Sequence, residues 1–214
     1  MRSPTGMFVV FEGGDGVGKT TQVELCCQWL EEQGCEVVRT FEPGDSAVGA
    51  AVRRIVLDPA TGEMSPRAEA LLYAADKAQH LFAVVRPALE RGAVVVCDRY
   101  VDSMLAYQGA GRVLAAAEVE QVARWATEDL RPHLTVVLDT EPGQAVSAKA
   151  HPDRLEAAGE VFHEAVRQHF LELAQREPEH YLVLDARDTR EAIAAQVRER
   201  LAPLLSVVEA RIEA

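Results

Sequence analysis

The sequence predicts an α/β fold, in which an open, doubly wound sheet of five parallel strands carries helices on both faces. Three observations support this prediction. Five short runs rich in Val and Leu alternate with helical patterns, three of these runs end in aspartate, and a glycine-rich segment follows the first run. Alternation of strand and helix is typical of right-handed βαβ crossovers, which place successive strands in parallel.

The five expected strands hardly alternate between apolar and polar residues, as is typical of strands buried on both faces of a parallel sheet. In chain order they are "MFVVF" from Met7, "CEVVRTF" from Cys35, "AVVVCD" from Ala93, "LTVVLD" from Leu134 and "YLVLD" from Tyr181. The last three runs end at Asp98, Asp139 and Asp185. Because such sheets bind ligands at the carboxyl ends of their strands, we expect the functional site at that edge.

Helical patterns occupy the segments between and after these strands. They cover residues 19–33, 47–57, 66–91, 114–128, 157–176 and 189–201. No internal repeat, low-complexity segment or linker divides the chain, so residues 1–214 are expected to form a single domain. Beyond Pro203, residues 203–214 are expected to form a helical tail.

Composition and charge exclude several classes of function. The 214 residues carry a formal net charge of -12, which would repel a nucleic-acid backbone, so no nucleic-acid partner is expected. No apolar run approaches the roughly 20 residues that cross a membrane, and the start lacks a signal-peptide pattern. The four cysteines have neither disulfide-framework nor metal-site spacing. We therefore expect a cytoplasmic protein with free thiols and no membrane partner.

The glycine-rich segment "GGDGVGKT" matches the pattern GxxxxGK[ST], between an expected strand and an expected helix. Glycines allow the torsions that turn successive N–H groups toward one anion, and the helix N-terminus adds its positive dipole end. Lys19 would reach the β- and γ-phosphates of a nucleoside triphosphate, and the Thr20 hydroxyl would ligate Mg²⁺. The expected ATP-binding residues are Gly13, Gly14, Asp15, Gly16, Val17, Gly18, Lys19, Thr20 and Thr21.

The base of that nucleotide is expected to be adenine. Signalling GTPases usually carry an [NT]KxD guanine motif, and each of the three lysines, Lys19, Lys77 and Lys149, follows a residue other than Asn or Thr. A kinase and an ATP-driven switch both remain compatible with the P-loop pattern.

A second informative segment is "CDRYVDSMLAYQGAGR", residues 97–112. Asp98 closes a strand, where its carboxylate would hold Mg²⁺ directly or through water. Arg99 follows at once and offers a guanidinium fork for a phosphate, although a structural ion pair is the alternative explanation. Tyr107 and Gln108 add a ring and an amide that would contact a base or a sugar.

A third segment, residues 69–92, places Tyr73 and Lys77 four positions apart, and therefore on one helical face. That face would present a ring for stacking and a donor for a base carbonyl. From this pattern alone, a core tyrosine beside a solvated lysine would be the commoner explanation.

Taken together, these segments closely resemble bacterial thymidylate kinases, a family of P-loop nucleoside monophosphate kinases. The resemblance rests on "FEGGDGVGKTT", "EPG", "LLYAADKAQH", "RPALERG", "CDRYVDSMLAYQGAGR", "RPHLTVVLD" and "DRLE", in unbroken order from about Met7 to Leu201. It implies transfer of the γ-phosphoryl group of ATP to dTMP, giving dTDP and ADP, with Mg²⁺, on the route to dTTP. Family members commonly form homodimers through long helices, and the apolar face of residues 68–89 would serve that purpose.

The resemblance also implies roles around the acceptor nucleotide. Tyr73 matches the aromatic residue that stacks on thymine, and Lys77 matches an arginine that bonds a base carbonyl. Asp15 matches an acidic residue near the acceptor sugar and phosphates, and Arg53 and Arg99 match arginines that grip the acceptor phosphate. The implied dTMP-binding set is Asp15, Arg53, Tyr73, Lys77, Arg99, Ser103, Met104, Tyr107 and Gln108.

Two further positions are expected on the ATP side. Residues 147–159 match the lid of the family, and Arg154, in "DRLE", matches a lid cation that reaches the transferring phosphate; an exposed, salt-bridging arginine is the alternative. Arg187, in "DARDT", lies where the family places its adenine loop. With Lys19, Arg99 and Asp15, Arg154 completes the expected catalytic set.

Four positions depart from the family pattern: Phe41 replaces an arginine, Asp45 a glycine, Lys77 an arginine, and Met104 a small polar residue. Each of them touches the expected acceptor pocket. Two alternatives therefore stay open: a kinase for another nucleoside monophosphate, and a nucleotide-binding homologue that has lost catalysis.

Overall fold

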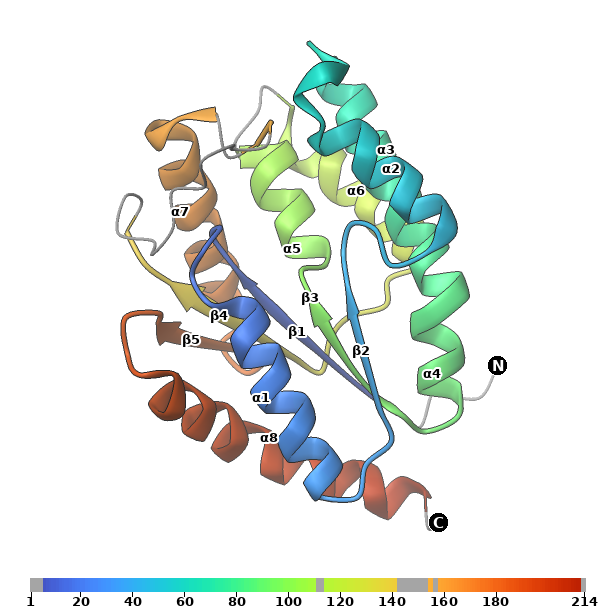
Figure 1. The fold of residues 1–214 in the computed structure, drawn as a ribbon, viewed down its shortest axis with the longest axis vertical. Coiled ribbons are helices and arrows are strands. Elements are labelled where there is room, and N and C mark those ends of the chain that lie inside the picture. The colour runs from blue at the N-terminus through green and yellow to red at the C-terminus, as the bar shows by residue number, and fades with distance from the viewer. Residues whose placement is uncertain (1–5, 111–113, 142–153, 156–157, 213–214) are drawn as a thin grey trace.

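One sheet organises the described part of the chain, which in the computed structural model comprises residues 6–110, 114–141, 154–155 and 158–212. All strand pairs are parallel, and the strand order is β2-β3-β1-β4-β5, so β1 is central (Figure 1). The five strands are β1 (Met7–Gly13), β2 (Val37–Phe41), β3 (Val94–Asp98), β4 (Leu134–Asp139) and β5 (Tyr181–Asp185). The doubly wound α/β class and all five predicted strands are confirmed.

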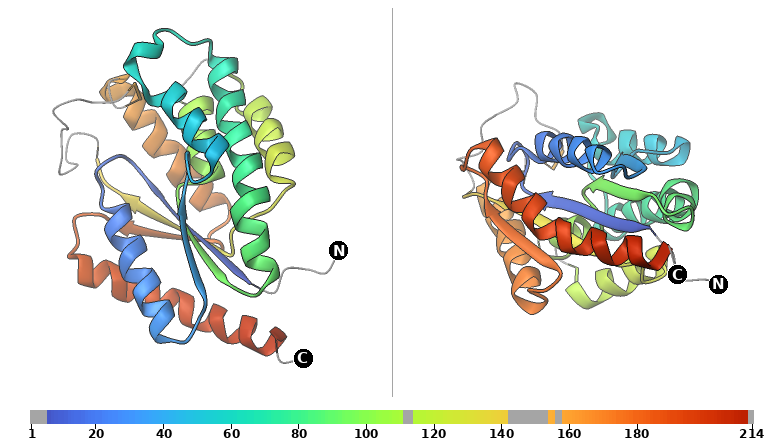
Figure 2. Two further views of the ribbon diagram at one scale, coloured as in Figure 1. Left: turned by 45° about the vertical axis from the view of Figure 1, so that its right-hand side comes forward. Right: turned by 90° about the horizontal axis from the view of Figure 1, so that it is seen from below.

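Helices cover both faces of this sheet (Figures 1 and 2). The helical elements are α1 (Lys19–Glu32), α2 (Ala47–Leu57), the short η1 (Pro59–Thr61), α3 (Pro66–His80), η2 (Leu81–Val85), α4 (Arg86–Glu90), α5 (Val101–Met104), η3 (Leu105–Ala110), α6 (Ala116–Thr127), α7 (Glu160–Arg176) and α8 (Arg190–Ile212). Among the described residues, no helix combines the length and the apolar character that crossing a membrane requires.

The buried side chains divide into two apolar clusters because successive strand residues point to opposite faces of a sheet. On β1, Val9 and Phe11 join α1 and α8 in one cluster, whereas Phe8 and Val10 join helices α2 to α7 in the other. Both faces of the central strand are therefore covered, which explains why the strand sequences lack a polar face.

Local sequence explains where two of the site-bearing helices begin. Ser46 and Ser65 cap α2 and α3, and their hydroxyls accept from the amides of Gly49 and Ala68. Side-chain capping satisfies N–H groups that the helix itself leaves unbonded.

The helix predicted over residues 66–91 is divided by the π-helical turn η2, and a second π-helical turn, η3, follows α5. Pro87, just inside α4, lacks the N–H that would donate to the carbonyl of Ala83, and such positions are typical of π-turns. At the other end of the chain, α8 runs through Pro203 without a break, so the expected tail is its continuation. Buried Leu201 and Leu205 hold the helix on both sides of that proline.

Candidate active site

The P-loop connects the central strand β1 to α1, and its glycines adopt torsions that other residues avoid. Gly13, Gly16 and Gly18 have φ values of 131°, 74° and 94°. A Cβ atom on Gly13 would lie 2.4 Å from the carbonyl oxygen of Leu138 in β4, so only glycine fits there. Gly18 occupies the N-cap of α1 and has no side chain to cap it, which leaves the amides of the first turn available for an anion.

Lys19 is held against this loop. Its ammonium donates to the carbonyl oxygens of Gly13 at 3.1 Å and Gly14 at 2.5 Å, and the side chain is buried. Burial, together with the nearby Arg99 charge, lowers the pKa of Lys19 to about 8, although Asp15 and Asp98 oppose the shift. The charge is thus destabilised until an anion arrives.

The two residues predicted to hold a metal ion lie together. The Thr20 hydroxyl donates to the Asp98 carboxylate across 3.1 Å. A hydroxyl and a carboxylate are the oxygen ligands that Mg²⁺ prefers, and Mg²⁺ usually takes its other ligands from phosphates and water. In the ranges that the structure describes, no cluster of three or more His, Cys, Asp and Glu side chains is suited to a metal. This pair fits a magnesium ion that is shared with a nucleotide.

Arg99 lies at the centre of the site, immediately after β3. Its backbone has a positive φ of 71°, unusual for a residue with a side chain, and its amide donates to the Phe11 carbonyl at 2.9 Å. Its guanidinium pairs with Asp15 at 2.7 Å, donates to Ser103 at 3.0 Å, and lies 5.2 Å from the ring centroid of Tyr107. Burial alone would raise the pKa of Asp15, but Arg99 and Lys19 outweigh it and lower that pKa to about 2.

All nine residues of the predicted dTMP-binding set line one pocket. The pocket lies beside the P-loop, between α2, α3 and the segment from Arg99 through η3. Its lining residues are Asp15, Glu42, Pro43, Arg53, Leu57, Tyr73, Lys77, Arg99, Ser103, Met104, Tyr107, Gln108 and Leu155. The sequence motifs thus predicted that residues up to 93 positions apart, from Asp15 to Gln108, line the same pocket.

A second cleft adjoins this pocket along the P-loop. It is lined by Asp15, Gly16, Gly18, Lys19, Thr20, Thr21, Val23, Arg39, Thr40, Phe41, Glu42, Arg53, Asp98 and Arg99. The cleft and the pocket share Asp15, Glu42, Arg53 and Arg99, so the two spaces adjoin. Most of the predicted ATP-binding residues lie here.

Four predicted ATP-binding residues are not among those that line the cleft: Gly13, Gly14, Val17 and Arg187. Val17 points into the core, where it packs in the apolar cluster under α1. Arg187 follows β5 and pairs with Asp185 at 2.7 Å, and it is not among the residues that line the cleft. The ion pair with Asp185 holds the Arg187 side chain at the end of β5, because side chains two residues apart in a turn can reach one another.

Arg154 also lies away from the P-loop in this structure. Its guanidinium pairs with buried Glu69 and donates to the Val56 carbonyl at 3.1 Å, at the end of α2. Glu69 in turn accepts from Gln108 at 3.2 Å. The predicted lid cation therefore supports the wall of the acceptor pocket. Lys149 and most of the expected lid, residues 147–159, lie outside the described residues.

Sequence reasoning missed three buried carboxylates. Glu12 accepts from the amides of Tyr100 and Ser103 and from the Ser103 hydroxyl, at 2.8, 3.1 and 2.6 Å, which supports the backbone around Arg99. Glu42 and Glu69 bind Lys77 and Arg154. Glu12 lies in the motif "FEGG" and Glu42 in "EPG", so both could have been singled out as site residues. Their partners could not, because these lie far away in the sequence.

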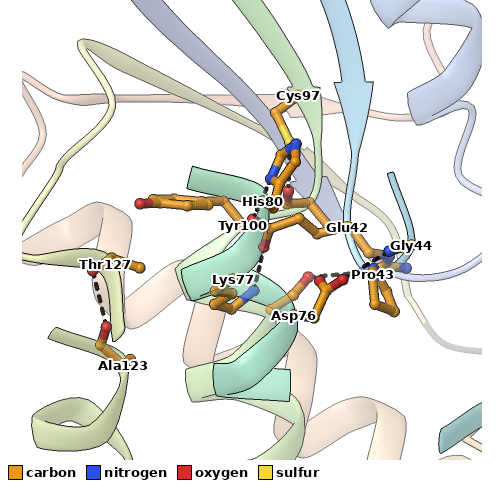
Figure 3. A network of polar contacts seen from close by, with 12 residues as sticks. Glu42, Pro43, Gly44, Asp76, Lys77, His80, Cys97, Tyr100, Ala123 and Thr127 are labelled. Carbon is orange, nitrogen blue, oxygen red and sulfur yellow. Dashed lines mark hydrogen bonds and ion pairs between the residues drawn. The ribbon is translucent and has the colours of Figure 1, made fainter. Parts of the chain in front are cut away.

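Lys77 lies at the edge of the pocket, where its ammonium is ion-paired. Its ammonium lies 2.5 Å from the Glu42 carboxylate, whose other oxygen contacts His80 at 2.7 Å (Figure 3). Although burial opposes ionisation of both partners, their attraction lowers the pKa of Glu42 and raises the pKa of Lys77. The spacing of Tyr73 and Lys77 alone favoured a solvated lysine, and that interpretation is wrong. Lys77 is buried and paired with Glu42.

Comparisons with known proteins identify the family of this chain. The thymidylate kinase family model matches residues 11–197. The thymidylate kinase of Cutibacterium acnes is 57% identical over 201 residues, covering 94% of this chain and 98% of that protein. That of Deinococcus radiodurans is 47% identical over 195 residues, covering 90% and 94%.

A solved structure shares the fold. The crystal structure of thymidylate kinase from Ehrlichia chaffeensis superposes with a TM-score of 0.72 at 28% identity, and the match covers 92% of this chain and 99% of that one. With a family model that spans most of the sequence and relatives that align end to end, this chain belongs to the thymidylate kinase family.

Proposed function

We propose that this protein transfers the γ-phosphoryl group of ATP to dTMP, giving dTDP and ADP, in a magnesium-dependent reaction in the cytoplasm. One observation carries the proposal: a P-loop cleft and a pocket lined by the whole predicted dTMP-binding set share Asp15 and Arg99. Two nucleotides bound in these two spaces meet through their phosphates. Family membership supports the same reaction.

On the donor side, the P-loop amides and Lys19 bind the phosphates of ATP. Thr20 and Asp98 would hold Mg²⁺, which supplies positive charge and orientation to the phosphate oxygens. Phosphoryl transfer has a loose transition state with charge spread over the equatorial oxygens, so positioning and charge neutralisation provide most of the catalysis. Lys19, Arg53 and Arg99 line the cleft where that charge would develop.

On the acceptor side, Arg99 and Arg53 bind the phosphate of dTMP. Tyr73 contacts the thymine ring, and Lys77 and Gln108 offer donors to its polar edge. Tyr107, whose hydroxyl donates to Asp15 at 3.2 Å, presents its ring to the sugar, where a ribose hydroxyl would be disfavoured. Asp15 orients Arg99 through their ion pair.

One assay distinguishes this proposal from its two alternatives, a kinase for another nucleoside monophosphate and a nucleotide-binding homologue that has lost catalysis. Purified protein with Mg·ATP is offered dTMP, dUMP, dCMP and AMP, and ADP formation is measured. We expect turnover to depend on dTMP and to be much weaker with the other acceptors. Equal turnover with several acceptors would favour the sibling kinase, and nucleotide binding without transfer to any acceptor would favour the inactive homologue.

We also propose a homodimer. Exposed apolar side chains gather over α2, α3 and α6, where Val48, Leu71 and Trp125 are 48%, 59% and 82% exposed. They line a shallow groove together with Ala74, Ala75 and Val122. Contiguous apolar surface of this kind is typical of protein interfaces, and it includes part of the apolar face that the sequence predicted for this purpose.

A further inference from the structure

Two neutral groups hold the guanidinium of Arg53 at the boundary between the P-loop cleft and the acceptor pocket, both of which Arg53 lines. Nη1 of Arg53 donates to the Pro43 carbonyl at 2.7 Å. The Cζ atom of Arg53 lies over the Phe41 ring, 5.7 Å from its centroid, which is within the range of a cation–π contact. Arg99 and Arg154 each pair with a carboxylate, whereas among the described residues no carboxylate forms an ion pair with Arg53.

The register of the sheet places Phe41 beside the site. Phe41 ends β2 opposite Asp98 of β3, so its ring lies at the carboxyl edge of the strands, where it lines the P-loop cleft. Neighbouring strand residues point to opposite faces, and Thr40 is buried while Phe41 remains 42% exposed. Burial therefore does not explain why an aromatic ring lies here, next to a cation.

Gly44 allows the ring and the arginine to approach one another. A Cβ atom on Gly44 would lie 2.9 Å from Cδ of Arg53 and 3.2 Å from Cε2 of Phe41. The Gly44 amide donates to the buried Asp76 carboxylate at 3.0 Å, which fixes the backbone that follows Phe41 (Figure 3). The ring and the Pro43 carbonyl thus belong to one anchored segment, residues 41–44.

Uncharged holding groups suit a cation that binds a phosphate. A carboxylate partner would also fix Arg53, but it would offset the positive charge and repel an incoming anion. The face of an aromatic ring and a carbonyl oxygen attract the guanidinium and leave its charge in place. The other N–H donors of the guanidinium remain for the phosphate. The arginine that is usual at the position of Phe41 in the resembled family would instead place a like charge beside Arg53.

We propose that Phe41 is a positioning residue for Arg53: its ring, together with the Pro43 carbonyl, holds the guanidinium at the boundary of the two spaces for the phosphate of the acceptor. Phe41 acts through Arg53 and not through a contact of its own with the nucleotide. The ordering of Arg53 by Phe41 is a property of the free protein, and only its consequence for dTMP rests on the proposed function.

The direct test is NMR relaxation of the arginine side chains in the protein without nucleotide. The Nε–H signal of Arg53 is assigned with Arg53→Met, and its order parameter is measured. We expect an ordered group in the wild type and an order parameter below about 0.6, the range of flexible groups, in Phe41→Leu. Phe41→Tyr should restore the order, and the control Phe82→Leu, which changes a 77% exposed ring on η2, should leave it unchanged. Equal order parameters in the wild type and Phe41→Leu would overturn the proposal.

Calorimetric binding of dTMP and of thymidine, which lacks the phosphate, tests the consequence. Phe41→Leu should raise the Kd for dTMP about 2- to 5-fold, the effect of one exposed cation–π contact, and leave the Kd for thymidine unchanged. In the Arg53→Met background, Phe41→Leu should have no further effect, because the two residues act as a pair. Equal losses for both ligands, or the same loss without Arg53, would mean that the ring acts on the nucleoside or on the fold and would contradict the positioning role. A protein that binds neither ligand, but in which Phe41→Leu loosens Arg53, would refute only the proposed function.

Discussion

At the scale of single residues, Lys19 carries a charge that the protein alone does not stabilise well. Its pKa is lowered to about 8, chiefly by burial, so a large fraction of molecules hold a neutral lysine at pH 8.5. Phosphates of ATP would favour the ammonium, because an anion at this distance stabilises the charged form. Binding of Mg·ATP should therefore be coupled to proton uptake.

Calorimetry measures this coupling directly. Mg·ATP is titrated into the protein at pH 8.5 in two buffers with different heats of ionisation, a pH at which ATP itself is fully ionised because its last phosphate pKa is about 6. We expect uptake of a substantial fraction of a proton, and affinity that falls as the pH rises above about 8. Lys19→Arg, always protonated, should bind without uptake. Equal uptake in Lys19→Arg would exclude Lys19 as the source.

Some of the site residues could be predicted from the sequence, and others could not. The P-loop residues, Arg99 and Tyr107 lie in short motifs whose spacing carries the chemistry, and the structure gathers them as expected. The roles of Glu12, Glu42 and Glu69 could not be predicted because their partners lie 35 to 91 positions away. For Arg154 the motif "DRLE" was identified, and a contact with the transferring phosphate was predicted from it. Its ion pair with Glu69 was not predicted.

At the scale of elements, the P-loop is shaped by the close approach of β1 and β4. Gly13 pairs with Leu138 in the sheet, and a Cβ on Gly13 would overlap the Leu138 carbonyl. Gly14, its neighbour, has room for a Cβ, which would meet only the Val17 side chain at 3.7 Å.

Alanine at these two glycines should therefore have different effects. Gly13→Ala combines a positive φ with a backbone clash and should destabilise the fold by about 2 kcal/mol or more, lowering Tm by about 4–8 °C. Gly14→Ala is the matched control and should change Tm by no more than about 2 °C. Thermal denaturation followed by circular dichroism measures both. Equal melting temperatures for the two variants would mean that β1 and β4 do not approach as closely as described.

The elements themselves were largely predictable, for physical reasons. Unbroken Val-rich runs can hardly be anything but buried parallel strands once helices lie between them. The π-turns η2 and η3 were not predicted: Pro87 removes one helical hydrogen bond beside η2, but the sequence alone does not show whether the helix ends there or continues through a π-turn. The continuation of α8 through Pro203 was also missed, since buried leucines on both sides outweigh the missing hydrogen bond.

At the scale of the whole molecule, the exposed apolar face over α2, α3 and α6 predicts self-association. Wild-type protein should sediment as a dimer at micromolar concentration. Leu71→Glu places a charge on that face and should give a monomer, because burying an unpaired carboxylate costs several kcal/mol.

The control for that experiment is Val161→Glu, which changes an 87% exposed valine on α7. This variant should remain a dimer with unchanged melting temperature. A wild-type monomer, or a Leu71→Glu variant that still dimerises, would remove this face from consideration as the interface.

The central claim is that donor and acceptor nucleotides occupy two adjoining spaces that meet at Asp15 and Arg99. A crystal structure with dTMP and a non-hydrolysable ATP analogue, grown with Mg²⁺, tests it most directly. We predict the analogue's phosphates along the P-loop beside Lys19, thymine against Tyr73, and the dTMP phosphate at Arg99. A thymidine nucleotide bound anywhere else on the molecule, with this pocket empty, would contradict the account.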